Sequence, residues 1–341
     1  MPVDRTAVGV GVIGLGVGEQ HARAFAAAPP CRVRALCDFD GARLAAIGRD
    51  FPDARRYESA DDLIDDPNVA VVSIASYDDH HFAQILRALR AGKHVFAEKP
   101  ICLTPSELRE IREAWRASGR RLSTNTILRS SPRFQWLKAA VADGTLGRLY
   151  CIEADYVYGR LSKLTDGWRG RIPGYSAILG GGIHLVDLIL WLTGERPIDV
   201  VGFGSGLASR HTAFKGNDLV LALLRFPSGL LVKIGANFAS VHPHFHRFLA
   251  YGTAATFENV QGSPEAAARL WQSRDATVEP QAIEAPYPGI GKGVLIPSFV
   301  AAVLGRGEPE VPEPEVFDAL SVCLAIDRAV AEERRVPIEY F

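Results

Sequence analysis

The first third of the chain alternates short apolar runs with segments in which apolar residues recur every three or four positions. Short apolar runs predict strands, and a period of about 3.6 residues predicts helices. The predicted strands cover residues 8–13, 32–37, 69–75, 94–97 and 121–125. The predicted helices cover residues 18–28, 40–49, 80–91 and 105–118. Because nearly continuous apolar strands alternate with helices, we expect a parallel sheet covered on both faces.

Local signals mark the end of one helix and the start of another. Pro29-Pro30 stops the first helix, because proline lacks the N–H that a continuing helix needs. Thr104 and Glu107 form a capping box, and Pro105 stands at the first helical position. The helix over residues 105–118 is therefore expected to begin at Thr104.

The pattern changes after about residue 125. The following strands are longer and alternate in polarity, which is typical of an antiparallel sheet with one buried face. These strands cover residues 149–158, 200–204, 219–226, 230–238 and 247–251, with a hairpin turn at Pro227-Ser228-Gly229. Helices are expected over residues 131–143, 184–192 and 316–332. We therefore predict an α/β domain over residues 1–125 and an α+β domain with a largely antiparallel open sheet over residues 126–341.

A glycine-rich turn lies between the first strand and the first helix. Its residues Gly14, Gly16, Val17 and Gly18 would let the backbone approach a pyrophosphate at the positive end of the helix. This context predicts a Rossmann dinucleotide-binding domain. Asp38 ends the second strand, 20 residues after Gly18, and a carboxylate there accepts hydrogen bonds from a ribose diol and repels a 2′-phosphate. NAD is therefore favoured over NADP, although Arg43 could soften the preference.

Composition excludes several classes of partner. The formal net charge of −1 over 341 residues argues against a general nucleic-acid binder and against an anionic membrane surface. No apolar run approaches the ~18 residues of a membrane span, and residues 8–15 form a strand and turn rather than a signal peptide. The five cysteines are scattered without a CxxC pair, which fits a reducing compartment. We expect a cytoplasmic protein.

Two polar positions suggest chemistry on an alcohol. Lys99 follows the strand over residues 94–97 within Glu98-Lys99-Pro100, and a lysine held there can be a fixed cation beside a nicotinamide ring. The alternative is a surface lysine before a turn. His184 follows three glycines, which allow close approach to a ligand, and histidine titrates near neutral pH and can take a hydroxyl proton. The alternative is a core histidine at the start of an apolar helix.

Several motifs in a fixed order resemble the glucose–fructose oxidoreductase and inositol dehydrogenase family (the GFO/IDH/MocA family) over essentially the whole chain. The ordered combination of Glu-Lys-Pro with a later Gly-x-His-x-x-Asp is the specific part of this resemblance. The matching residues are Gly14-Leu15-Gly16 with His21, the loop from Ser76 to His81, Glu98-Lys99-Pro100, Arg129 with Pro132 and Phe134, Gly181-Gly182-Ile183-His184-Leu185-Val186-Asp187, and Tyr251-Gly252-Thr253.

The resemblance implies roles for particular residues. Lys99 would lie near the nicotinamide and the reacting oxygen, and His184 would carry the proton. The remaining cofactor contacts would be Ser76, Tyr77, His81 and Glu98, together with Trp168 and Arg169 from the segment over residues 156–175. Substrate would be bound by Arg129, Tyr158, Arg171, His184 and Asp187. The cations of this segment could instead form a solvated loop, and Asp187 could be a capping or ion-pairing residue.

The sequence departs from the family pattern in three places. The usual third glycine would stand at Glu19, with the histidine one step later than His21. Many members carry an aspartate four residues before the histidine, where this chain has Gly180. The usual Pro-Asn of the loop after the fourth strand is Tyr77-Asp78.

Three histidines, His242, His244 and His246, alternate along the sequence and would share one face of a strand. Pro243 interrupts the run and no acidic residue accompanies it, so we predict no metal site and favour a sheet-edge or subunit contact.

The expected activity is hydride transfer between NAD and a secondary alcohol or ketone of a sugar, polyol, inositol or sugar acid. One alternative is cleavage of a glycosidic bond through transient oxidation by NAD. Another is a non-catalytic sensor of dinucleotide and sugar, which the glycine at position 180 favours and the retained Lys99 and His184 oppose. The open face of the second sheet offers apolar strands, and the family resemblance implies that they are buried in a homodimer or homotetramer.

Overall fold

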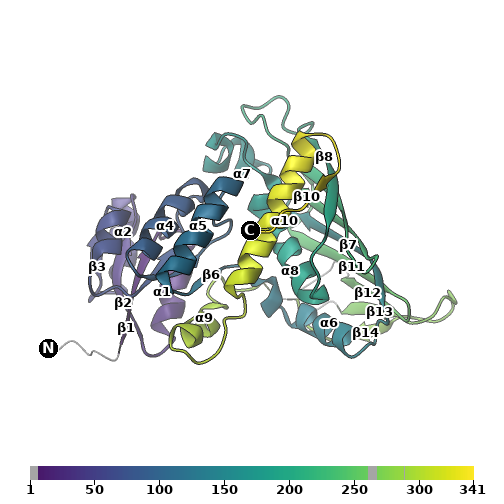
Figure 1. The fold of residues 1–341 in the computed structure, drawn as a ribbon, viewed down its shortest axis with the longest axis horizontal. Helices are drawn as coiled ribbons and strands as arrows, with labels where there is room; N and C mark the ends of the chain where they lie inside the picture. Colours follow the sequence, from purple (N-terminus) through teal and green to yellow (C-terminus); the bar gives the residue numbers. More distant parts are fainter. Residues whose placement is uncertain (1–6, 260–266, 288) are drawn as a thin grey trace. The chain divides into compact units, whose positions relative to one another are not determined.

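The computed structural model describes residues 7–259, 267–287 and 289–341, which form two compact units (Figure 1). Unit 1 comprises the described residues up to Ile127, together with Gly291–Phe317 and Phe341. Unit 2 comprises the described residues of Leu128–Ile290 and Asp318–Tyr340. The chain therefore returns to unit 1 late in the sequence. The predicted domain boundary after residue 125 assigned this returning segment to the second domain.

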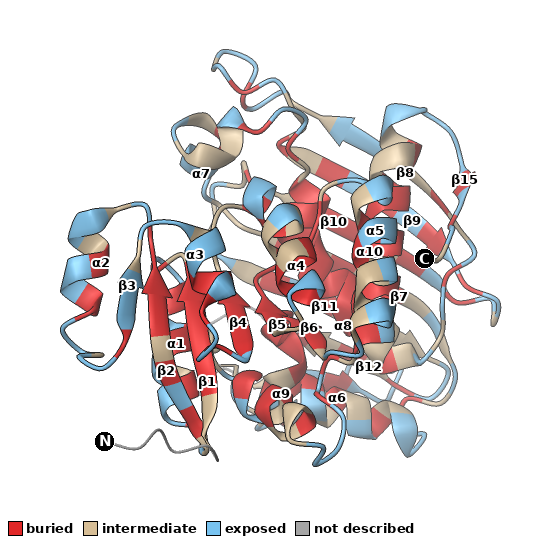
Figure 2. Ribbon diagram, turned by 60° about the vertical axis from the view of Figure 1, so that its left-hand side comes forward, coloured by how far each residue is buried: buried red, intermediate tan, exposed pale blue. Residues whose placement is uncertain are grey.

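Unit 1 is built on a six-stranded sheet whose strand order is β3-β2-β1-β4-β5-β6. All neighbouring strands are parallel, which confirms the predicted Rossmann architecture. Figure 2 shows β1 and β2 as largely buried, and the strands on either side of β1 expose almost no apolar side chain. The strands are β1 Val8–Ile13, β2 Cys31–Cys37, β3 Arg55–Tyr57, β4 Val71–Ile74, β5 His94–Ala97 and β6 Leu122–Thr124.

The helices of unit 1 pack in two groups. Helix α4 contacts α3 and α5, and α1 contacts α9 of the returning segment. Thr104 and Glu107 form the predicted capping box at the start of α5, and both of its hydrogen bonds are present. The helices are α1 Gly18–Ala26, α2 Gly41–Ile47, α3 Ala60–Asp65, α4 His81–Arg90, α5 Pro105–Ser118 and α9 Ile296–Val303.

Unit 2 contains a nine-stranded sheet in the order β14-β13-β12-β11-β7-β10-β9-β8-β15. Only β10 and β7 pair in parallel among its described strands, so the prediction of a largely antiparallel sheet is confirmed. The strands are β7 Leu149–Val157, β8 Asp199–Ser205, β9 Leu219–Arg225, β10 Leu231–Asn237, β11 Phe245–Gly252, β12 Thr256–Asn259, β13 Ala268–Trp271, β14 Gln281–Ile283 and β15 Val336–Pro337.

Helices cover one face of this sheet and leave the other face exposed. Helix α8 packs on β7 and α6, and every second residue of β9 is buried on that side. The helices are α6 Pro132–Ala142, α7 Ser162–Thr165, α8 Ile183–Thr193 and α10 Glu313–Ala331, the last of which begins within the residues of unit 1. None of the helices among the described residues is both long enough and apolar enough to cross a bilayer.

Several short elements carried no periodic signal in the sequence. Strand β3 has only three residues, two of them exposed arginines, and β12 to β14 are three or four residues long. The prediction that three alternating histidines share a strand is wrong. Strand β11 begins at Phe245, so of the three only His246 lies on it.

Candidate active site

The glycine turn of unit 1 forms a cradle for an anion. Gly14 adopts a φ of +80°, and a Cβ on it would lie 2.5 Å from the carbonyl oxygen of Ala75. A Cβ on Gly16 would have no other atom within 4 Å, so the backbone there is open. Helix α1 begins at Gly18, where the first N–H groups of a helix attract phosphate oxygens. These features fit the pyrophosphate of a dinucleotide.

Gly18 explains the shortened glycine motif. A Cβ on Gly18 would lie 3.1 Å from the Cγ1 of Val12 and 3.3 Å from the Cβ of Ala75, so the missing side chain lets α1 pack close to the sheet. The following Glu19 lies in the first turn and pairs with Arg23 at 2.8 Å. The close packing of helix on strand that the motif requires is thus provided one position earlier than usual.

Asp38 anchors the turn from the end of β2. Its Oδ2 accepts a hydrogen bond from the backbone N–H of Leu15 at 2.7 Å, and its Oδ1 accepts one from Asp40 N–H at 2.8 Å. The Nη1 of Arg43 lies 3.4 Å from both oxygens. The carboxylate therefore holds the turn in place while Arg43 offsets part of its charge.

The loop after β4 is tied to Pro100 by His81. The Nδ1 of His81 lies 2.7 Å from the carbonyl oxygen of Pro100, and its Nε2 lies 3.1 Å from the carbonyl oxygen of Ser76. The hydroxyl of Ser76 donates to Gln84 Oε1 at 2.7 Å. His81 is fully buried, so its main contribution is to fix the Ser76 loop beside the Lys99-Pro100 segment.

Glu98 is a buried carboxylate with Asn125 and His21 beside it. Its Oε1 accepts a hydrogen bond from Asn125 Nδ2 at 2.6 Å and lies 3.3 Å from Nε2 of His21, whose Nδ1 is 2.9 Å from Ser73 Oγ. Burial acts to raise the pKa of Glu98, but the bond with His21 and the positive charges of His21, Lys292 and Lys99 outweigh it and lower the pKa to about 2. Glu98 is therefore an anion at neutral pH.

Lys99 follows this anion at the carboxyl end of β5 and is only 8% exposed. The network around Glu98 contains Asn125 and Lys292, which the sequence did not single out. Asn125 directly follows β6, and its Nδ2 also donates to the carbonyl oxygen of Lys292 at 2.8 Å. A polar residue at the carboxyl end of a parallel strand was a usable signal for Asn125. No local pattern pointed to Lys292, which lies in the returning segment.

In unit 2, His184 is the second residue of α8, which directly follows a π-helical turn over Ile178–Gly182. Its ring stacks on Tyr156 with a centroid distance of 6.2 Å and meets the edge of His246 at 6.4 Å. A Cβ on Gly181 would lie 2.4 Å from Cε1 of Tyr156, so glycine is required for this approach. Burial raises the pKa of the Tyr156 phenol, which is therefore neutral.

Gly180 stands where the family resemblance led us to expect an aspartate. A Cβ there would lie 2.0 Å from the hydroxyl oxygen of Tyr175, so this hydroxyl occupies the space that a side chain would take. Arg169 Nε donates to the same hydroxyl at 3.0 Å, and its guanidinium lies 4.3 Å over the ring of Trp168. The predicted Trp168 and Arg169 are thus brought together with Tyr175, which the sequence analysis did not single out.

Ser176 connects the π-helical turn to α10. Its hydroxyl accepts a hydrogen bond from Leu179 N–H at 3.0 Å and donates to Asp327 Oδ1 at 2.8 Å. Burial raises the pKa of Asp327 to about 7, although the bond from Ser176 acts in the opposite direction. A residue from the last helix therefore supports the turn that positions His184.

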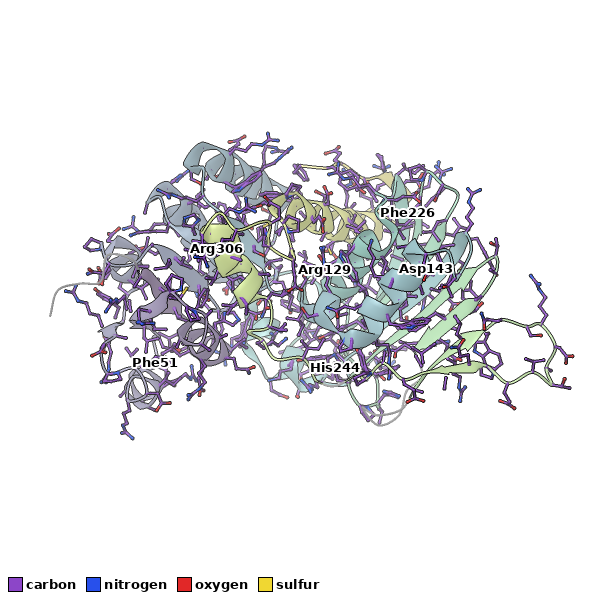
Figure 3. The ribbon with its side chains drawn as sticks, turned by 90° about the horizontal axis from the view of Figure 1, so that it is seen from below. Phe51, Arg129, Asp143, Phe226, His244 and Arg306 are labelled. Carbon is purple, nitrogen blue, oxygen red and sulfur yellow. The ribbon has the colours of Figure 1, made fainter. Side chains whose placement is uncertain are left out.

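Arg129 and Asp187, both predicted to bind substrate, bind each other. The Nε and Nη2 of Arg129 donate to Oδ2 and Oδ1 of Asp187 at 2.8 and 2.6 Å, and neither residue is more than 2% exposed. Figure 3 labels Arg129, which precedes α6. This bidentate pair joins that segment to α8 and favours a supporting role over direct recognition of an anion.

Tyr158 belongs to an aromatic group that also contains His244, labelled in Figure 3. Its ring lies 4.9 Å from Phe238 and 5.2 Å from His244, with Arg160 4.9 Å above its face.

Arg171 is exposed at the end of the turn Trp168–Arg171. Among the described residues, no group of three histidine, cysteine or acidic side chains is placed to hold a metal ion.

Models of one protein family match both parts of the chain. Residues 8–126 match the oxidoreductase family described as an NAD-binding Rossmann fold, and residues 134–258 match the GFO/IDH/MocA C-terminal domain. A 1,5-anhydro-D-fructose reductase from Ensifer adhaerens is 28% identical over 289 residues, covering 82% of this chain and 83% of that protein. An inositol 2-dehydrogenase from Acidothermus cellulolyticus is 31% identical over 240 residues, covering 69% and 67%.

Solved structures share the fold over nearly the whole chain. A levoglucosan dehydrogenase in complex with NADH superposes with a TM-score of 0.85 at 21% identity, covering 98% of this chain and 100% of that one. The myo-inositol 2-dehydrogenase from Lactobacillus plantarum gives a TM-score of 0.83 at 19% identity, with the same coverage.

We expect Glu98→Gln to lower the free energy of unfolding at pH 7 by up to about 3 kcal/mol, because the pKa of Glu98 falls from 4.5 to about 2 on folding. Because the pKa of Glu98 is lower in the folded protein than in the unfolded one, its ionisation stabilises the fold at pH values above about 4.5. This contribution disappears as the pH falls from about 4.5 toward 2. Urea denaturation of the cofactor-free protein at several pH values measures the difference. Glu110→Gln, an exposed carboxylate of the same unit, is the control and should change little; an equal loss in both variants would contradict the prediction.

Gly181→Ala should destabilise unit 2 by about 1–3 kcal/mol, because the new methyl group would force the buried Tyr156 ring away from His184. Gly41→Ala is the matched control, since a Cβ at that position has no atom within 4 Å. The denaturant concentration at the midpoint of unfolding would be measured for both variants. Equal midpoints would show that the Tyr156 ring does not require the absence of a side chain at Gly181.

Proposed function

The chain belongs to the GFO/IDH/MocA oxidoreductase family, and on that premise we propose that it exchanges a hydride between NAD and a secondary alcohol or ketone of a sugar, polyol, inositol or sugar acid. The relatives' names, an anhydrofructose reductase and an inositol 2-dehydrogenase, support a polyhydroxylated ring as substrate. The observation that carries the proposal is Lys99, a buried cation at the carboxyl end of β5, beside the ionised Glu98. Open α/β sheets bind their ligands at this edge.

The cofactor would be held by residues of unit 1. The turn from Gly14 to Gly18 and the start of α1 suit the pyrophosphate, and Asp38 suits the ribose. We propose Ser76, Tyr77, His81 and Glu98 as the walls and supports of the same site, and we retain Trp168 and Arg169 as further proposed contacts. When bound, NAD supplies the acceptor or donor of the hydride.

Lys99 and His184 would have separate tasks. The Lys99 ammonium would stabilise negative charge on the substrate oxygen as its proton leaves. A ring nitrogen of His184 would accept that proton during oxidation and return it during reduction. We propose Tyr158 and Arg171 as substrate contacts, with the buried pair of Arg129 and Asp187 holding the start of α6 and α8 in place.

Lys99→Ala is expected to lower kcat by roughly 100-fold or more on any accepted substrate, because an oxyanion loses its fixed cation. Purified protein would be incubated with NAD and a panel of sugars, sugar acids and inositols while nicotinamide absorbance is followed. Lys215→Ala, an exposed lysine of unit 2, is the control and should retain full activity. NADH binding, followed by fluorescence, should persist in both variants.

The outcomes separate the competing functions. Turnover that Lys99→Ala abolishes would establish the dehydrogenase. Tight NADH binding without turnover on the whole panel would contradict it and favour transient oxidation during glycoside cleavage or a sensor. Absence of NADH binding would refute all three.

We infer a reducing, cytoplasmic environment from the cysteines. All five are free thiols in the described part of the chain, and four of them are buried. Burial raises the pKa of Cys31 to about 11 and that of Cys37 to about 12, so these thiols are protonated and unreactive.

We propose that the exposed face of the second sheet binds another copy of the chain. Large apolar side chains project from neighbouring strands there, and Phe203 lies opposite Leu221 in the strand register. Leu223 and Leu231 on β9 and β10 are also more than half exposed. A soluble monomer rarely exposes a contiguous apolar patch of this kind, and a second copy presents the same surface.

Leu223→Glu should shift the protein toward the monomer in analytical ultracentrifugation, because a charge would be buried at the centre of the contact. Val278→Glu, which changes an exposed apolar residue outside the sheet strands, should leave the oligomer unchanged. A wild-type monomer, or an unaltered oligomer in Leu223→Glu, would argue against this interface.

A further inference from the structure

A buried arginine joins three segments of unit 2 to which the proposed function assigns no role. Arg133, on α6, is only 1% exposed. Its Nε donates a hydrogen bond to the carbonyl oxygen of Ala285, and its Nη1 donates one to Oδ1 of Asn259, each at 2.9 Å. Removing a guanidinium from water is costly, so the groups that it holds in place are candidates for a functional role.

Both arms of this guanidinium lead to one pair of side chains, His246 and Tyr287. The Nδ2 of Asn259 donates to the backbone carbonyl oxygen of His246 at 2.7 Å. Tyr287 lies two residues after Ala285, and Arg133 lies 5.4 Å over its ring. The Tyr287 hydroxyl is hydrogen-bonded to Nδ1 of His246. The arginine therefore fixes the backbone of the histidine and the ring of the tyrosine together.

His246 connects the surroundings of His184 with a side chain that reaches solvent. His184 and His246 are 5% and 8% exposed, whereas Tyr287 is partly exposed. The ring centroids of the two histidines are 6.4 Å apart, and their planes are at 84°. One water molecule or substrate hydroxyl can bridge the nitrogens of two rings at this separation. Burial raises the pKa of the Tyr287 phenol, so its hydroxyl keeps a proton at neutral pH.

We propose that His246 and Tyr287 carry the proton of the oxidised alcohol from His184 to solvent; this inference rests on the proposed function. Each hydride that passes to NAD leaves one proton behind, and a buried base must lose that proton before the next turnover. In the balanced step, an N–H bond of the His184 imidazolium breaks and Nε2 of His246 gains a proton. The Nδ1 proton of His246 passes to the Tyr287 oxygen, whose original proton goes to water. Reduction uses the same route inwards.

The test asks whether a free base can replace the relay. His246→Ala and Tyr287→Phe should each lower kcat roughly tenfold for oxidation of myo-inositol, or of whichever sugar, sugar acid or inositol the wild type oxidises best. The Kd of NADH should stay within about twofold of the wild type. Added imidazole should raise kcat in both variants as its concentration increases, whereas sodium chloride at the same ionic strength should not. The wild type should not respond to imidazole.

Tyr340→Phe is the matched control. Tyr340 is also a partly exposed phenol of unit 2, and it donates one hydrogen bond, at 2.7 Å, to the carbonyl oxygen of Pro197. This variant should keep the wild-type kcat. If His246→Ala does not fold, Tyr287→Phe decides by itself.

Two results would overturn the relay while leaving the proposed function intact. One is a wild-type kcat in Tyr287→Phe, and the other is a loss of kcat that imidazole does not restore. A wild-type protein that binds NADH but oxidises no member of the panel would instead refute the proposed dehydrogenase, and the relay with it.

Discussion

A buried negative charge at the end of β5 organises the nucleotide-binding unit. An ionised carboxylate without polar partners would be expelled from such a site or would bind a proton. Glu98 keeps its charge because α1 contributes His21, the end of β6 contributes Asn125 and the returning segment contributes the charge of Lys292. Segments from distant parts of the sequence must therefore be in place before the carboxylate next to Lys99 is stable. The same requirement fixes the backbone from which Lys99 projects.

In the second unit, the surroundings of His184 depend on the absence of side chains at two glycines. Gly180 and Gly181 leave room for the hydroxyl of Tyr175 and the ring of Tyr156, and no larger residue could stand there without displacing them. The Tyr156 ring in turn stacks on His184. Glycine at position 180 is thus a steric necessity in this chain. The space holds the hydroxyl of Tyr175, which accepts a hydrogen bond from Arg169.

These two devices suit different tasks. Compensated charge holds the backbone that carries the lysine in one position, as stabilisation of a substrate oxygen requires. Close aromatic packing restricts the orientation of an imidazole without fixing its charge, as an exchange of protons requires.

The sequence by itself determined the parallel and antiparallel sheets and the glycine turn, because each rests on a local pattern of hydrophobic period or turn residues. It predicted Asp38, Lys99 and His184 as site residues from strand ends and neighbouring glycines. It did not predict β3 or the strands β12 to β14, which are too short to show a period. Only the tertiary structure decided that Arg129 and Asp187 pair with each other and that Tyr175 fills the space beside Gly180. It also decided that Asn125 and Lys292 join Glu98. Some of these contacts join residues far apart in the chain, and others depend on the shape of a neighbouring side chain. Neither kind of contact leaves a periodic signal in the order of amino acids.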